Sequence, residues 1–117
     1  MKPANGAYLA HIRDAIEQIE LFSSIHTYDQ YISNTWDQAA VARNLEIIGE
    51  AATQLSVEFK EAHREIPWRK ISDFRNILTH EYFAIDPLLV WEIIQKDLPR
   101  LKKDIERLLE KVEGIRS

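Results

Sequence analysis

The fold class of this chain is decided by residues 91–112, WEIIQKDLPRLKKDIERLLEKV. Apolar residues recur there at alternating steps of three and four, which is the spacing of one face of an α-helix; they are Trp91, Ile94, Leu98, Leu101, Ile105, Leu108 and Val112. A stripe of this length indicates a helix that packs on its neighbours along most of its length. Pro99 lies inside the stretch and should kink the helix, because proline removes one backbone donor and crowds the preceding turn.

The same spacing continues through most of the chain and predicts three further helices, over about residues 7–25, 35–59 and 67–79, with a short turn of helix near 28–32. Only three glycines are present, and the alternating pattern of strands is missing. We therefore expect one all-α domain over residues 1–117, an up-and-down bundle of four or five helices.

Residues at the expected helix starts support these boundaries. Asn5 is suited to cap the first helix, and Asn34 or Thr35 the second. Pro67 can occupy the first position of the third helix without losing an intrahelical hydrogen bond. At the start of the last helix, Asp86 is suited to cap the helix and Pro87 to occupy its first position.

Composition excludes several classes of function. The 15 basic and 19 acidic residues give a formal charge of -4, so no domain-wide positive field attracts a polyanion, and any nucleic acid must be held by a local patch. The absence of cysteine removes disulfides, thiolate nucleophiles and zinc-thiolate sites. No apolar run could cross a bilayer and no leader pattern opens the sequence, so we expect a cytoplasmic protein without membrane contact. No motif for a metal or another cofactor is found.

Polar and titratable side chains crowd into the segment RNILTHEY, residues 75–82. Arg75 falls at the edge of the apolar stripe of its helix and should face a groove or a partner. His80 lies roughly 140° around a continuous helix from Arg75, so a straight helix would not bring the two side chains together. Either the helix unwinds near Thr79, or the two residues meet their counterparts across a two-fold dimer axis, and the dimer is the interpretation we favour.

The string Arg75-x4-His80-x-Tyr82 resembles the signature of the HepT-like family of the HEPN superfamily, and Asn76 matches the polar residue that commonly follows its arginine. The stretches RNLEIIGEAA (43–52), IPWRKI (66–71) and YFAID (82–86) are similar to other recurring parts of that family, in the same order. The resemblance covers nearly the whole chain and implies an all-helical homodimer.

It also implies a function. Many HepT-like proteins are ribonuclease toxins encoded beside a MntA-like minimal nucleotidyltransferase, an antitoxin that attaches AMP to the tyrosine of the signature in a type VII-like toxin–antitoxin pair. By this resemblance Arg75 and His80 are the catalytic pair, Asn76 positions the RNA substrate, and Tyr82 is the residue modified by adenylylation. No metal or other cofactor is expected.

These residue types suit metal-independent cleavage of RNA. Histidine titrates near neutral pH and can move the proton of the 2′-hydroxyl or of the leaving group. A guanidinium supplies fixed positive charge where the phosphorane develops. Because only RNA carries the 2′-hydroxyl, DNA should stay intact.

Each of these residues also has a structural interpretation. Arg75 could form an ion pair with Asp73 or with a glutamate of another helix, His80 could interact with a helix C-terminus, and Tyr82 could be a half-buried aromatic residue. The other histidines are expected at the surface or the edge of the core: His11, His26 and His63. The chain could then be a non-catalytic partner or substrate-binding subunit of a nucleotidyltransferase, or a plain structural bundle.

A basic patch for the RNA backbone is possible near the middle of the chain. Its candidates are Lys60, Arg64, Arg69 and Lys70. Acidic residues alternate with them, namely Glu58, Glu61 and Glu65, so an ordinary solvated surface accounts for the segment equally well.

Overall fold

The computed structural model describes residues 5–76 and 86–114, and the regular elements in those ranges are all helical. The long elements are α1 (Asn5–Ser23), α3 (Thr35–Gln54) and α7 (Leu98–Gly114). The shorter ones are α2 (Tyr28–Ile32), α4 (Val57–Ala62), α5 (Trp68–Ser72), the 3₁₀ helix η1 (Asp73–Asn76), α6 (Pro87–Glu92) and the π-helical turn η3 (Ile93–Asp97). The predicted all-α fold is confirmed.

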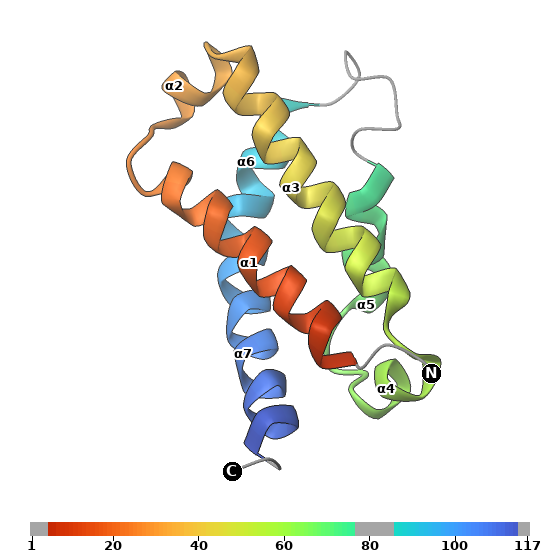
Figure 1. Cartoon of the computed structure of the whole chain (residues 1–117). Coiled ribbons are helices and arrows are strands. Elements are labelled where there is room, and N and C mark those ends of the chain that lie inside the picture. The colour runs from red at the N-terminus through yellow and green to blue at the C-terminus, as the bar shows by residue number, and fades with distance from the viewer. Residues whose placement is uncertain (1–4, 77–85, 115–117) are drawn as a thin grey trace.

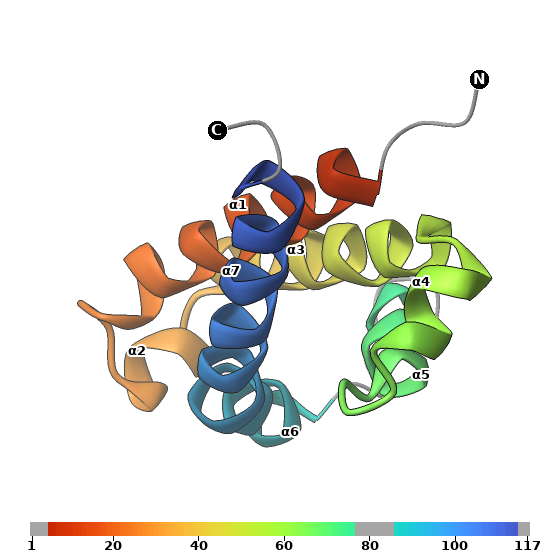
Figure 2. The same cartoon turned by 90° about the horizontal axis from the view of Figure 1, so that it is seen from below.

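The elements alternate in direction (Figure 1). α1 rises, α3 descends, α5 with η1 rises, and the run from α6 to α7 descends. α3 packs against α1 on one side and against α5 and η1 on the other, while α7 packs against α1. Seen from below, α2 and the α4–α5 segment lie at opposite ends of the bundle (Figure 2). The topology is up-and-down, as predicted.

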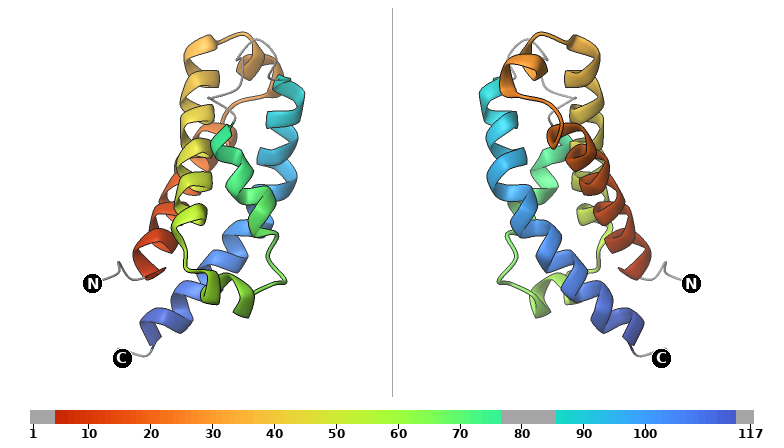
Figure 3. Two further views of the ribbon diagram at one scale, coloured as in Figure 1. Left: turned by 90° about the vertical axis from the view of Figure 1, so that its right-hand side faces the viewer. Right: turned by 90° about the vertical axis from the view of Figure 1, so that its left-hand side faces the viewer.

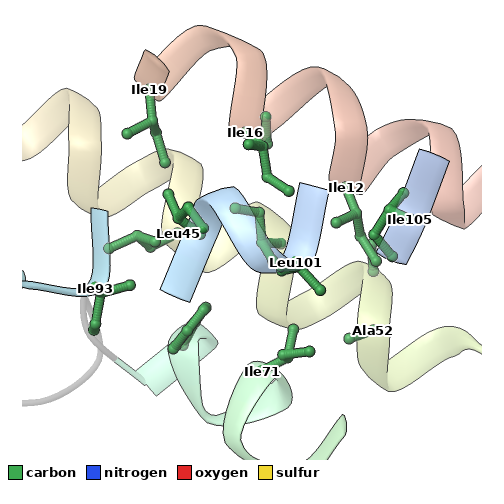
Figure 4. Close-up of a cluster of buried hydrophobic side chains, with 14 of the residues drawn as sticks. Ile12, Ile16, Ile19, Leu45, Ala52, Ile71, Ile93, Leu101 and Ile105 are labelled. Carbon is green, nitrogen blue, oxygen red and sulfur yellow. The ribbon is translucent and has the colours of Figure 1, made fainter. Parts of the chain in front are cut away.

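One apolar core joins these helices (Figure 4). α1 contributes Ile12, Ile16 and Ile19, all at most 1% exposed, and Leu45 on α3 faces them. Ile71 of α5 and Leu101 and Ile105 of α7 close the cluster from the other helices. Full burial of each such side chain stabilises the fold by about 1.5–3 kcal/mol, so these stripes account for the arrangement of the long helices.

Capping residues fix several helix starts where the sequence predicts them. The Asn34 side chain accepts hydrogen bonds from the backbone N–H groups of Trp36 and Asp37, at 3.0 and 3.1 Å, and caps α3. Asp86 accepts from the Leu88 N–H at 2.9 Å, with Pro87 as the first residue of α6. Each cap satisfies backbone donors that have no partner inside the helix.

The predicted cap of the first helix is wrong. Asn5 is itself the first helical residue, and its amide contacts Ser56 at the junction between α3 and α4. The Asn5 side chain donates to the Ser56 hydroxyl at 3.3 Å and accepts from the Ser56 backbone N–H at 3.1 Å. The Asn5 side chain therefore contacts a residue distant in sequence instead of capping its own helix.

The second predicted helix ends earlier than its apolar stripe. α3 stops at Gln54, Leu55 is extended, and Ser56 caps α4 by accepting from the Phe59 N–H at 3.1 Å. Phe59, expected on the same helix, therefore belongs to α4. The cap and the Asn5 contact at Ser56 outweigh continuation of the helix.

The third predicted helix is also different in the described part. Pro67 precedes α5 as its cap residue, and the α-helix gives way to the 3₁₀ helix η1 after Ser72. The buried residues Trp68, Ile71 and Phe74 are spaced by three, a period that suits a 3₁₀ helix better than an α-helix. The expected end near Thr79 lies outside the described residues.

Pro99 is accommodated by the π-helical turn η3, which directly precedes α7. A π turn carries one more residue than an α turn and occurs as a local bulge, which changes the backbone spacing where the proline ring would crowd the preceding turn. The helix changes direction between α6 and α7 (Figure 3). The predicted kink therefore takes the form of a π turn.

The short helix predicted near 28–32 is confirmed as α2. Its Tyr31 ring packs against Trp91 with ring centroids 5.3 Å apart, and only 2% of Tyr31 is exposed. Burial, with a smaller contribution from Tyr28, raises the pKa of Tyr31 to about 12. Trp68 and Trp91 both join or border the core, as predicted.

Candidate functional site

The backbone of η1 rests directly on α3 at Gly49. A Cβ atom placed on Gly49 would lie 2.3 Å from the backbone nitrogen of Arg75 and 2.8 Å from the carbonyl oxygen of Ser72. No side chain fits at that spacing, so glycine is needed here for close approach of two backbones. The position of Arg75 relative to α3 is set by this contact.

Arg75 extends its side chain along α3 toward Thr53. The guanidinium Nη1 donates a hydrogen bond to the Thr53 hydroxyl oxygen at 3.2 Å. That hydroxyl in turn donates to the Gly49 carbonyl oxygen at 2.9 Å. Arg75 is exposed, and among the described residues it forms no ion pair, neither with Asp73 nor with a glutamate of another helix.

Arg75 and Asn76 line a groove of about 480 Å³ that α1, α3 and η1 enclose. α1 contributes Tyr8 and His11, and α3 contributes Arg43, Glu46, Ile47, Glu50, Ala51 and Gln54. The Tyr8 and His11 rings meet edge to face, with centroids 6.2 Å apart. Its volume is within the range of small-molecule sites in proteins.

One ion pair neutralises two of the four charged side chains that the described residues place in this groove. Arg43 forms an ion pair with Glu46 one turn away on α3. The Glu50 carboxylate accepts a hydrogen bond from the Gln54 amide at 3.2 Å. Arg75 has only a neutral hydroxyl as its described side-chain partner. Arg75 therefore keeps its charge and several of its N–H donors for an anionic ligand, while Glu50, bonded to a neutral amide, keeps its negative charge in the same groove.

The structure brings together two of the four predicted site residues. Arg75 and Asn76 are neighbours on η1 and face the same groove, and Asn76 is half-buried. His80 and Tyr82 lie outside the described residues.

The sequence did not single out the contributions of α1 and α3. His11 was expected to be a surface or core-edge residue, and it is exposed, but it stands in the groove that holds Arg75. Gly49 and Thr53 were not predicted as site residues either. A one-turn spacing of four residues places Gly49 and Thr53 on one helix face, and that is the only signal in the sequence that links them.

The other two histidines occupy the structural positions expected. His26 stacks on Phe22 with ring centroids 4.2 Å apart, and its Nδ1 lies 2.8 Å from the Phe22 carbonyl oxygen. His63 packs against Phe59 and lies 3.7 Å from the Glu65 carboxylate. Neither lines the groove.

The possible basic patch is partly neutralised. Lys70 forms an ion pair with Asp97 at 3.2 Å, and Lys60 donates to the Ala52 carbonyl at 3.4 Å. Glu65, from the same segment, pairs with Arg107 at 3.0 Å. The ion pair removes Lys70 from the basic candidates, and both interpretations of the segment stay predictions.

Within residues 5–76 and 86–114, no group of three or more histidine, aspartate or glutamate side chains is arranged to hold a metal ion. No helix in these ranges is long and apolar enough to span a membrane.

The fold and the groove define a class of small all-helical bundle proteins. In the part of this chain that the structure describes, the groove presents an arginine without an acidic partner at the end of a short helix. Comparison with known proteins identifies the family. The model of the ribonuclease HepT-like family matches residues 12–108, and the chain belongs to this family.

Three relatives illustrate the match. A probable ribonuclease HepT of Thermococcus cleftensis is 40% identical over 92% of this chain and 98% of its own length. A protein of Methanocaldococcus jannaschii, named as a gamma-glutamylcyclotransferase and candidate RNase, is 41% identical over 91% of this chain, which spans about half (48%) of that longer protein. A candidate RNase of Caldanaerobacter subterraneus is 38% identical over 89% of this chain and 93% of its own length. No solved structure gives a significant match.

Proposed function

We propose that this chain is a metal-independent endoribonuclease of a HepT–MntA type toxin–antitoxin pair. The observation that carries the proposal is the state of Arg75, an exposed cation in a groove whose described partner is a neutral hydroxyl. A structural ion pair would neutralise this charge, whereas a site for a phosphodiester needs it. Family membership and relatives named as ribonucleases support the same activity.

The reaction would be an intramolecular transesterification of RNA. The 2′-hydroxyl oxygen attacks the adjacent phosphorus and the bond from phosphorus to the 5′-oxygen breaks, which leaves a 2′,3′-cyclic phosphate and a 5′-hydroxyl. His80 takes the proton of the 2′-hydroxyl or supplies the proton of the leaving oxygen, since histidine titrates near neutral pH. Arg75 binds the phosphate oxygens as negative charge develops on them, and Asn76 positions the phosphate or the ribose.

The active form would be a homodimer. Two-fold symmetry presents every signature residue twice, so the Arg75 of one protomer and the His80 of its partner can line one cleft. This arrangement does not require the Arg75 and His80 side chains of one protomer to meet.

Tyr82 would be the regulatory residue and a MntA-like nucleotidyltransferase its modifying partner. Its hydroxyl oxygen would attack the α-phosphorus of ATP and release pyrophosphate, leaving AMP on the tyrosine. The added phosphate would compete with RNA for Arg75, both by its size and by its charge.

Cleavage of a fluorescent RNA by the purified protein tests the catalytic proposal. Arg75→Ala should lower the rate about 10²- to 10³-fold, the range typical for loss of a group that stabilises transition-state charge. His80→Ala should abolish cleavage, and a chelator should leave the native rate unchanged. Arg100→Ala, an exposed arginine on α7 outside the groove, is the matched control and should cleave normally.

Full activity in Arg75→Ala would refute the catalytic assignment. Absence of cleavage by the native dimer, together with stable binding to a nucleotidyltransferase, would favour the non-catalytic partner instead. Sedimentation at micromolar concentration should show a dimer, and a monomer at every concentration would exclude the shared cleft.

Co-expression with a MntA-like nucleotidyltransferase tests the regulatory proposal. Mass spectrometry should find one or more adenylate increments on the peptide that contains Tyr82 and none in Tyr82→Phe. The phenylalanine variant should keep its ribonuclease activity. Modification at Tyr8, which lies in the groove, would assign the switch to a different residue.

A further inference from the structure

One hydroxyl on α3 joins the backbone of that helix to the guanidinium of Arg75. Thr53 Oγ1 donates to the Gly49 carbonyl oxygen at 2.9 Å and accepts from Arg75 Nη1 at 3.2 Å. A threonine hydroxyl carries one hydrogen and two lone pairs. Because its hydrogen is committed to Gly49, the hydroxyl presents only lone pairs to the guanidinium, and it is therefore oriented as an acceptor for the arginine.

The backbone of Arg75 is fixed by a separate contact one turn earlier on α3. Gly49 allows η1 to approach so closely that a methyl group at this position would overlap the Arg75 nitrogen. α3 thus determines both ends of the arginine, its main chain at Gly49 and its guanidinium at Thr53. The two residues are four apart, so they lie on the same face of the helix.

Because the Thr53 hydroxyl is neutral, it binds the Arg75 guanidinium without cancelling its positive charge. A carboxylate at position 53 would hold the guanidinium more tightly and also cancel its charge. The Thr53 hydroxyl occupies one of the five N–H donors of Arg75 and leaves the charge and the other donors for a ligand. Glu50, which follows Gly49 on α3, is hydrogen-bonded to the Gln54 amide rather than to Arg75.

We infer that Thr53 is a positioning residue that orients Arg75 toward the phosphate of bound RNA. This inference rests on the proposed ribonuclease function. It predicts that loss of the Thr53 hydroxyl slows the chemical step while RNA binding and folding are retained, since the arginine stays in the groove but samples more orientations.

Three variants test the inference. Thr53→Val keeps the shape of the side chain and removes the acceptor, and it should lower kcat roughly 5- to 20-fold with KM nearly unchanged, because misorientation of a catalytic group costs rate more than affinity. Thr53→Ser retains the hydroxyl and should restore most of the rate. Thr35→Val, an exposed threonine at the start of α3, is the matched control and should match the native enzyme.

A second measurement does not depend on activity. NMR of the arginine side chains should show a distinct Arg75 guanidinium signal in the native protein and in Thr53→Ser, and this signal should average toward that of a free arginine in Thr53→Val. Native kcat together with an unchanged Arg75 signal in Thr53→Val would overturn the inference.

The two proposals fail in different ways. If Arg75→Ala cleaves RNA as fast as the native protein, the ribonuclease assignment of Arg75 fails, while the NMR result still decides whether Thr53 orders the guanidinium. If Arg75→Ala is inactive and Thr53→Val is fully active, the ribonuclease proposal stands and the positioning role of Thr53 is wrong.

Discussion

Replacement of Gly49 by alanine should destabilise the protein although alanine is the better helix former. In an open helix this change stabilises by about 1 kcal/mol. At position 49 the new methyl carbon would stand 2.3 Å from the Arg75 nitrogen, 2.8 Å from the Ser72 oxygen and 3.0 Å from the Arg75 Cα atom. All three are backbone atoms, so no side chain can turn aside to relieve the overlap.

The magnitude follows from the displacement that is required. Restoring ordinary contact distances moves η1 outward by about 1 Å, and overpacking of this kind typically costs about 1–3 kcal/mol. Because only backbone atoms stand in the way, the upper part of this range, about 2–3 kcal/mol, applies. After the gain of about 1 kcal/mol in helix propensity, a net loss of about 1–2 kcal/mol remains. For a domain of 117 residues this corresponds to a decrease of about 4–8 °C in Tm.

Thermal unfolding followed by circular dichroism measures the effect, and the chain offers a matched control. Gly6 is also helical, but a Cβ there would meet only the Val112 side chain, at 3.2 Å, and that methyl group can shift. Gly6→Ala should therefore leave Tm unchanged or raise it. An equal rise in Gly49→Ala would refute the close contact between η1 and α3, and with it the mechanism that places Arg75.

Three further predictions concern the fold. Leu45→Ala, at a fully buried position, should lose about 2–5 kcal/mol in urea unfolding, whereas Leu88→Ala, 47% exposed, should change stability by no more than about 0.5 kcal/mol. Asp86→Ala should lose about 1 kcal/mol by removing the cap of α6, and Asp86→Asn should restore most of it; equal stability of all three proteins would contradict the capping role. Stability should decline as the pH rises from 10 toward 12, since Tyr31 holds its proton to about 12 in the folded protein but releases it near 10.0 in the unfolded chain. Tyr31→Phe should show a flatter pH profile in this range, and an identical decline in both proteins would assign the effect to other groups.

The sequence predicted the helices well where a long apolar stripe and a strong cap agree. Asn34 and the stripe through Leu45 place α3, and Asp86 with Pro87 places α6. Errors occur where a contact distant in sequence overrides the local pattern. The stripe through Phe59 looked continuous, but the hydrogen bonds at Ser56 divide it into two helices.

The site was predictable only in part, for a related reason. Crowding of polar residues marks Arg75 and Asn76, and both line the groove. The opposite wall comes from α1, more than sixty positions earlier in the chain, and no spacing rule relates His11 to Arg75. The close contact of η1 with Gly49 joins two backbones, so no pattern of side chains in the sequence indicates it.

The π turn before α7 divides one long helical rod, which runs from α6 to α7, into two parts whose apolar faces point in different directions. The upper part turns Trp91 toward Tyr31 of α2, and the lower part turns Leu101 and Ile105 into the core shared with α1. A continuous α-helix over the same residues would rotate one part against the other by about 100°, and one of the two faces would lose its partner. The extra residue that the π turn takes up therefore sets the relative direction of the two faces.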